Sequence, residues 1–256
     1  MSKKIFVVVA LVIMIAVNIL SNALPFNGLT APDVADLFDV YFLPAGYVFS
    51  IWGIIYLGLI AYALYQFLPA QRENPRLSQI GGWFVLSSAA NSIWLFLWHY
   101  GYFGLSVFAM LTLLMSLIVI YLRLSDSGGT ISSGERWLVH LPFTIYLGWI
   151  SVATIANVTA FLDFVNWNGF GISEVNWMFI MLVVVVIVAG MMAYFRKSVA
   201  YLLVFIWALV GIGAEQAETA QVANAANLAA SVVGLFVLLV IIQNFRQTRT
   251  PGLETS

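Results

Sequence analysis

Cysteine is absent from this 256-residue sequence, and charged residues are scarce. Without cysteine the chain has no disulfide, no thiolate metal site and no cysteine nucleophile. Asp, Glu, Lys and Arg make up 8% of the residues, against about 25% in soluble domains. So few charges cannot cover a water-exposed surface, and 62% of the residues are hydrophobic. The composition predicts an integral membrane protein in contact with the lipid bilayer, and the net charge of −1 gives no reason to expect a nucleic-acid partner.

Ionisable side chains are missing where membrane pumps need them. No Asp, Glu, Lys or Arg lies near the middle of any apolar segment, although proton pumps and ion-coupled transporters usually carry such a group there. The two histidines, His99 and His140, fall on opposite membrane faces in the predicted topology and cannot share a metal. No nucleophile with a base is apparent. We therefore predict a protein that is not an enzyme, has no metal site and requires no cofactor.

Eight apolar segments have about the length needed to cross a hydrocarbon core, which takes roughly 20 helical residues. They span residues 5–24, 47–68, 80–98, 104–122, 137–162, 177–195, 199–214 and 222–242. The seventh is short, and only three residues join it to the sixth. The pattern predicts an all-α polytopic bundle of about eight transmembrane helices.

Basic residues support this topology, because short cytoplasmic loops retain Lys and Arg. The eight-span arrangement places all ten on one side: Lys3, Lys4, Arg72, Arg76, Arg123, Arg136, Arg196, Lys197, Arg246 and Arg249. The only formal charges in the opposite loops are acidic. We expect both termini in the cytoplasm and a multi-pass protein of the bacterial inner (plasma) membrane. Residues 1–23 also fit a signal peptide, whose cleavage would leave seven spans.

Three spans carry polar and aromatic residues at helical spacing, so that each set shares one face. The sets are Phe49, Trp52, Tyr56 and Ala63; Ser87, Asn91, Trp94 and Trp98; and Tyr146, Trp149, Ala153 and Asn157. Since lipid-facing Asn is costly, Asn91 and Asn157 should point inward. A shared hollow walled by indoles and amides would suit a flat apolar ligand with a few polar edges. Alternatively, the amides only link helices and the aromatic residues only fill the core.

Span eight has small residues at four-residue spacing, at Ala226, Ala230 and Gly234. This spacing permits close helix contact. The contact partner is either a helix of the same chain or a second copy in a homodimer.

Three stretches resemble the TspO/MBR family, the tryptophan-rich sensory or translocator proteins. LPAGYVFSIWGIIY (43–56), SSAANSIWLFLW (87–98) and LPFTIYLGWISVATIAN (141–157) are similar to that family's second, third and fifth helices. The resemblance implies a five-helix domain over residues 1–165. Three additional transmembrane helices over residues 166–243 and a disordered cytoplasmic tail over residues 244–256 would follow it. The sequence departs from the family at Pro44-Ala45-Gly46-Tyr47, where Pro-Pro-x-Trp is usual.

The resemblance also implies a ligand pocket between helices that takes porphyrins such as haem or, in mitochondrial members, sterols. Together with the stripes, it makes these the candidate ligand-binding residues: Pro44, Trp52, Tyr56, Asn91, Trp94, Trp149, Ala153 and Asn157. The expected function is a membrane receptor, sensor or carrier for a hydrophobic small molecule. Three alternatives stay open: a facilitative transporter of a small amphipathic solute, a structural or regulatory partner protein, and an enzyme acting on a lipid-soluble substrate. The last would be favoured if Asp163, Glu174, Glu215 and Glu218 converged on one outer cavity.

Overall fold

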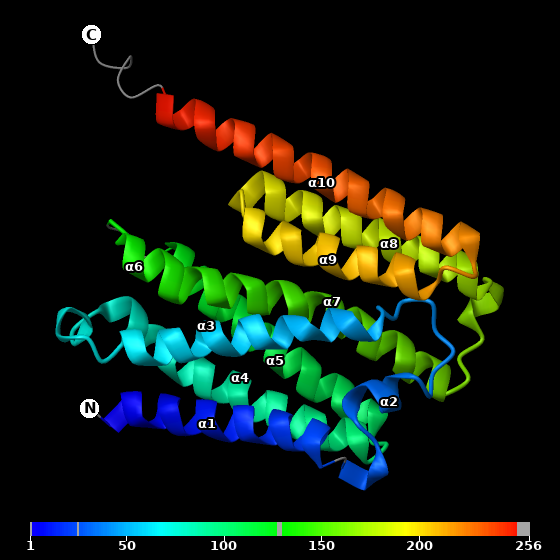
Figure 1. The fold of residues 1–256 in the computed structure, drawn as a ribbon, viewed down its shortest axis with the longest axis horizontal. Helices are drawn as coiled ribbons and strands as arrows, with labels where there is room; N and C mark the ends of the chain where they lie inside the picture. Colours follow the sequence, from blue (N-terminus) through cyan, green and yellow to red (C-terminus); the bar gives the residue numbers. More distant parts are fainter. Residues whose placement is uncertain (1, 25, 127–129, 250–256) are drawn as a thin grey trace.

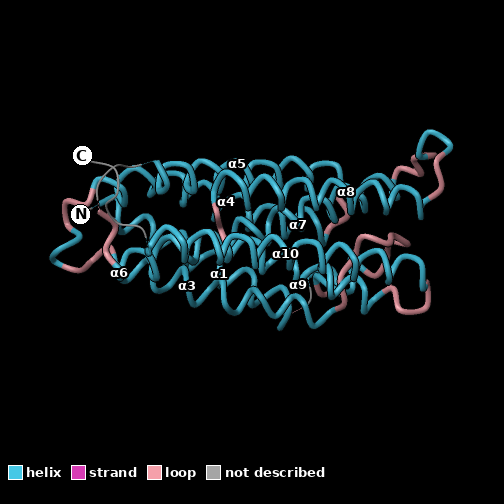
Figure 2. The backbone as a smooth tube through the Cα atoms, turned by 90° about the horizontal axis from the view of Figure 1, so that it is seen from above, coloured by secondary structure: helices cyan, strands magenta, loops and turns pink. Residues whose placement is uncertain are grey.

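A computed structural model describes residues 2–24, 26–126 and 130–249 and contains helices but no strand in those ranges. Its eight long helices run along a common axis, and the connections gather at the two ends of the bundle (Figures 1 and 2). They are α1 Ser2–Ala23, α3 Ile51–Tyr65, α4 Pro75–His99, α5 Phe103–Asp126, α7 Leu141–Phe164, α8 Glu174–Met191, α9 Val199–Glu215 and α10 Ala220–Arg249. The predicted all-α bundle is confirmed.

Short helical turns extend or connect these helices. They are η1 Phe26–Gly28, α2 Ala31–Ala35, η2 Gly46–Ser50, η3 Pro69–Gln71, α6 Ser133–Glu135, η4 Arg136–His140, η5 Gly169–Gly171 and η6 Met192–Arg196. With these turns included, seven helices in the described part of the chain are long and apolar enough to cross a membrane. The eighth, α9, has 17 residues, or about 26 Å at 1.5 Å per residue. The chain is thus an integral multi-pass membrane protein; its assignment to the bacterial inner membrane stays a prediction.

Local sequence signals set several helix ends. Asn74 caps α4, where its side-chain oxygen accepts a hydrogen bond from the backbone N–H of Arg76 and Pro75 occupies the first turn, a position that needs no N–H donor. Ser173 caps α8 in the same way through the N–H of Asn176. Lys197 adopts left-handed geometry, with φ of 48°, and so turns η6 directly into α9. The tight predicted hairpin between the sixth and seventh spans therefore forms.

Helix packing follows a continuous path through the bundle. α4 packs against α1 and α5, α5 against α7, and α7 against α3 and α9. α10 then packs against both α9 and α8. In Figure 1 the last three helices form one side of the bundle, and α9 faces the first five. The last three helices are thus joined to the others chiefly through α9.

Polar contacts between basic residues and neighbouring segments concentrate at one end of the bundle, where α1 begins and α10 ends (Figure 1). Lys4 Nζ donates to the Gln66 carbonyl at 2.5 Å, and Arg196 pairs with Asp126 at 3.2 Å. Arg76 binds both oxygens of the buried Glu135 carboxylate. These basic residues share one end of the bundle, as the predicted alternation of basic and acidic loops requires. The cytoplasmic location of that end stays a prediction.

The sequence predicts a disordered tail from residue 244, but α10 continues beyond that position. The helix continues to Arg249, because the sequence contains no Gly or Pro between Gly234 and Pro251 to stop it. Residues 250–256 lie outside the described residues.

The small residues at four-residue spacing in α10 are only partly packed. Ala226 and Ala230 are buried, whereas a Cβ added at Gly234 would meet nothing within 4 Å. The homodimer stays a prediction.

Candidate functional site

An aromatic hollow of about 580 Å³ lies between α1, the start of α3, and α4. Its volume is in the range of small-molecule sites, about 300–1,000 Å³. It lies in the half of the bundle opposite the basic end, because its lining comes from the end of α1 and the start of α3. The lining residues are Asn18, Ile19, Asn22, Ala23, Phe49, Trp52, Tyr56, Trp94 and Leu95.

Two stacked rings form one wall of this hollow. The rings of Trp52 and Tyr56 have centroids 5.4 Å apart and an interplanar angle of 21°. Two rings of α7 meet Trp52 edge to face: Tyr146 at 5.8 Å and Trp149 at 6.3 Å. Such aromatic pairs contribute about 0.5–1.5 kcal/mol each beyond area burial. The α7 rings therefore help to fix the position of the Trp52 indole, which lines the hollow.

Side-chain amides link α1 to α4 beside the hollow. Asn18 Nδ2 donates a hydrogen bond of 2.7 Å to Asn91 Oδ1 and a second to the Met14 carbonyl. Asn22 Nδ2 in turn donates to the Asn18 carbonyl at 2.9 Å. Asn91 is fully buried, and its Nδ2 has no hydrogen-bond partner. Asn91 thus acts on the hollow through Asn18, which lines it.

Asn157 makes a separate set of hydrogen bonds on the other side of α4. Its Oδ1 accepts from the Trp94 indole Nε1 at 3.3 Å, and its Nδ2 donates to Ser106 Oγ on α5 at 3.0 Å. The Trp94 ring also stacks on Trp98, with centroids 6.0 Å apart. These contacts fix the orientation of the Trp94 indole, which lines the hollow.

The eight candidate residues therefore divide into three groups. Trp52, Tyr56 and Trp94 line the hollow, and Asn91, Asn157 and Trp149 each contact a lining residue. Ala153 is partly buried against the core, and Pro44 lies elsewhere. The sequence predicts a hollow between spans two, three and five, where Tyr146 and Trp149 on α7 contact Trp52; the candidate set stays a prediction. The aromatic hollow beside Trp52 is lined from α1, α3 and α4, and the sequence-based candidates do not include Asn18 and Asn22, which line it. Their four-residue spacing within an apolar helix was the available signal.

Pro44 belongs to a turn that docks on α9. The Ala45 N–H donates to the Gly211 carbonyl at 3.1 Å, and the Trp207 indole donates to the Val48 carbonyl at 3.0 Å. A Cβ added at Gly211 would lie 3.4 Å from Pro44 and would overlap Val48. Helix α9 thus sets the position of the turn that leads into Phe49 and Trp52.

The loop after α1 covers the outer ends of α4 and α5. Phe38 packs edge to face on Phe103, at 4.9 Å, and contacts Trp98 at 5.5 Å. Asp33 Oδ2 accepts hydrogen bonds from the Thr30 hydroxyl at 2.6 Å and the Thr30 N–H at 2.7 Å. These bonds stabilise the carboxylate and lower the pKa of Asp33. The loop is therefore a folded cover for this end of the bundle.

Acidic residues partly converge in a second hollow of about 510 Å³. Asp39, Asp163 and Glu174 line it together with Trp167 and Trp177, whereas Glu215 and Glu218 do not.

The two histidines lie apart: His99 Nδ1 contacts the Leu95 carbonyl at 2.7 Å, and His140 lies 4.0 Å from Glu135. Among the described residues, no three His, Asp or Glu are grouped as metal ligands.

A family model described as TSPO-like protein matches residues 4–241. The match extends from α1 nearly to the end of α10, and so it includes the three helices beyond the five-helix resemblance. No curated protein and no solved structure gives a significant match.

Proposed function

The chain belongs to the family of TSPO-like proteins, and from that premise we propose that it is a membrane receptor, sensor or carrier for a flat hydrophobic molecule such as a porphyrin. The ligand occupies the aromatic hollow between α1, α3 and α4. The protein carries or senses this ligand, and it requires no cofactor.

The stack of Trp52 on Tyr56 is the observation that carries this proposal. Both rings line the hollow, and α7 supports Trp52 through the edge-to-face contact with Trp149. Aromatic rings prefer offset stacking or edge contacts with other π systems, and a porphyrin offers a large π surface. Asn18 and Asn22 supply amide groups on the opposite wall, suited to the polar edges of such a ligand.

The position of the hollow favours binding over passage. All of its lining residues lie in one half of the bundle, and none of them is charged. A facilitative transporter would need a path that reaches both faces. We therefore propose that the protein binds its ligand rather than forming a channel for it, and that the site catalyses no reaction.

Protoporphyrin titration of purified protein in neutral detergent tests the proposal, with porphyrin absorbance and tryptophan quenching as readouts. Ala23→Phe places a ring in the hollow from the exposed end of α1. Ala16→Phe is the matched control, since Ala16 is also exposed on α1 but does not line the hollow. We expect saturable binding by wild type and by Ala16→Phe. Ala23→Phe should weaken binding about tenfold or more, because its ring occupies part of the hollow; a tenfold change corresponds to about 1.4 kcal/mol. Wild-type protein that gives no saturable signal, or equal affinities for all three, contradicts the proposal.

A further inference from the structure

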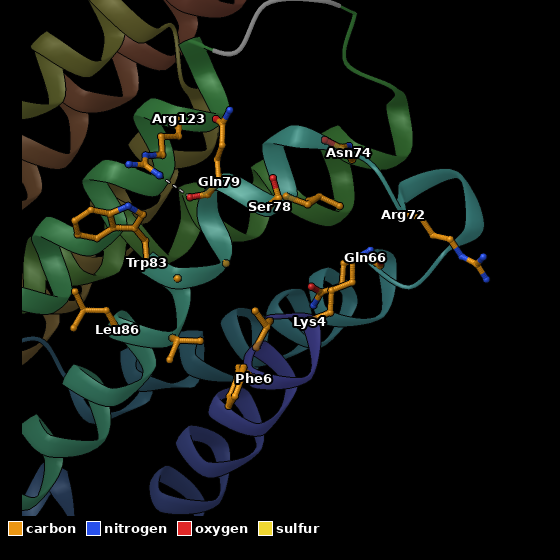
Figure 3. Close-up of a pocket in the computed structure, with 15 residues that line it drawn as sticks. Lys4, Phe6, Gln66, Arg72, Asn74, Ser78, Gln79, Trp83, Leu86 and Arg123 are labelled. Atoms are coloured by element: carbon orange, nitrogen blue, oxygen red, sulfur yellow. Dashed lines mark hydrogen bonds between the residues drawn. The ribbon is translucent and has the colours of Figure 1, made fainter. Parts of the chain in front are cut away.

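A third and larger hollow lies at the basic end of the bundle, between α1 and α4 (Figure 3). Its volume is about 940 Å³, and it shares no lining residue with the aromatic hollow. Its polar lining includes Lys4, Arg72 and Arg123 with the amides of Gln66 and Asn74. Among the residues that the structure describes, no Asp or Glu lines it. Its polar part is thus rich in hydrogen-bond donors and positive charge.

Gln66 indicates that this hollow is built for a ligand. Its side chain is buried and lines the hollow, and its Nε2 group has no hydrogen-bond partner within the described part of the chain. A buried donor left unsatisfied costs about 1–3 kcal/mol. The backbone carbonyl of Gln66 holds the Lys4 ammonium at 2.5 Å, and Figure 3 shows the two side chains close together. An acceptor placed between them would satisfy the amide and pair with the ammonium.

Arg123 marks the other side of the polar region. Its Nη1 donates to the Gln79 carbonyl at 2.7 Å, and its guanidinium lies 5.5 Å from the centre of the Trp83 ring. The nearby carboxylate of Glu135 is bound by Arg76 at 2.6 Å and 2.9 Å, so that its charge is compensated. The net field in the hollow therefore favours an anion.

The remaining wall is apolar and opens toward the lipid. Phe6 and Leu86 are exposed at its edges. Gly81 and Gly82 leave a notch in α4, and a Cβ added at Gly82 would meet nothing within 4 Å. A charged region continuous with an apolar notch at a membrane interface matches an amphiphile, in which an anionic head is joined to a hydrocarbon chain.

We propose that this hollow binds one anionic phospholipid, with the phosphate at Lys4 and Gln66 and part of an acyl chain in the notch at Gly82. Interfacial Lys and Arg attract anionic lipid heads, and the unsatisfied Gln66 amide adds a directional donor. The apolar notch distinguishes this ligand from a free phosphate ion, which shares the same head chemistry. The site is independent of the proposed porphyrin site.

Binding of phosphatidylglycerol by the delipidated full-length protein in neutral detergent tests this proposal. Native mass spectrometry counts the bound lipid, and phosphatidylcholine of the same chains is the zwitterionic comparison. We expect one saturable phosphatidylglycerol per chain, and affinity reduced about fivefold or more by Lys4→Gln, because a basic charge near an anionic head contributes measurably. Arg136→Gln is the charge-matched control, since Arg136 is exposed at the same end but lies outside the hollow. Equal binding of both lipids, or equal loss in the control, overturns the proposal.

Gln66→Leu separates a ligand-binding role from a structural one. The substitution removes an unsatisfied buried amide, and so the melting temperature without lipid should stay unchanged or rise. The gain in melting temperature on adding phosphatidylglycerol should shrink. A lower melting temperature without lipid, with an undiminished lipid effect, shows a structural role and contradicts the proposal.

Gly82→Leu tests the acyl notch and distinguishes a lipid from a free anion. The new side chain fills open space, and so the fold should persist while phosphatidylglycerol binding falls. Gly53→Leu is the matched control, since Gly53 is also exposed in a helix with nothing within 4 Å of an added Cβ. Inorganic phosphate should not compete at millimolar concentration. If it does, and Gly82→Leu binds phosphatidylglycerol like wild type, the hollow is a phosphate site and the lipid assignment is wrong.

Discussion

Asn18 on α1 donates a 2.7 Å hydrogen bond to Asn91 on α4, and both side chains are buried. This bond joins two of the three helices that line the aromatic hollow. It also explains how a residue outside the lining influences the site, because Asn91 fixes the rotamer of Asn18. The hollow therefore depends on an interhelical amide pair as well as on its rings.

A double-mutant cycle with Asn18→Ala and Asn91→Ala should give a coupling energy of about 0.6–1.7 kcal/mol, the range for interhelical hydrogen bonds in membranes. Unfolding in detergent, followed by circular dichroism, measures it. Thr112→Ala combined with Asn18→Ala is the control, since the Thr112 hydroxyl donates to the Phe108 carbonyl of its own helix. A coupling as small as that of the control would contradict the assigned bond.

Gly211→Ala should destabilise the protein by about 1–3 kcal/mol, the usual cost of overpacking. Its new methyl group would overlap Val48 in the docked turn. Gly234→Ala is the matched control on α10, where an added Cβ meets nothing within 4 Å and the melting temperature should hold or rise. Equal melting temperatures for the two variants would show that the turn is not packed on α9 as described.

Arg76→Leu should lower the free energy of unfolding by about 3–5 kcal/mol, because it leaves the buried Glu135 carboxylate without its ion partner. The two atoms Arg76 Nε and Glu135 Oε1 are 2.6 Å apart. Adding Glu135→Leu should recover part of the loss by removing the uncompensated charge. Chemical denaturation compares the three proteins; a double variant that is less stable than Arg76→Leu alone would refute this explanation.

Single cysteines at Leu37 and Glu73 should react with a membrane-impermeant maleimide from opposite faces of sealed vesicles. Both positions are exposed, and they lie in the loops at the two ends of the bundle. The chain has no native cysteine, and so each signal is unambiguous. Glu73→Cys should react from the cytoplasmic face, in keeping with the Lys and Arg bias; labelling of both from one face would overturn the topology.

Helix number and order were predictable from the sequence because each depends on local properties. The length of each apolar segment defines a span, and the alternation of basic and acidic loops indicates which loops lie on the same side of the membrane. The predicted span 222–242 lies within α10, for example, and the predicted span 199–214 within α9. The end of α10 was harder to place, because polar residues after Ile242 continue a helix as readily as they leave it.

The side of the bundle that holds the hollow could not be predicted. Periodicity places Trp52 and Trp149 on inward faces, and the two rings contact each other edge to face at 6.3 Å between α3 and α7. Only the packed arrangement shows that room is left beside Asn18. Likewise, the contact of Pro44 with α9 depends on a helix outside the five-helix resemblance. Tertiary packing, rather than local pattern, decides both.

Protection of a single cysteine by porphyrin tests the central claim most directly. Asn22→Cys introduces a thiol into the lining of the aromatic hollow, whereas Leu37→Cys introduces one at an exposed position outside it. Protoporphyrin should slow maleimide labelling of Asn22→Cys several-fold in a saturable manner and leave Leu37→Cys unaffected. Equal labelling rates with and without porphyrin at Asn22→Cys, under conditions where porphyrin binds, would contradict the assignment of this hollow as the ligand site.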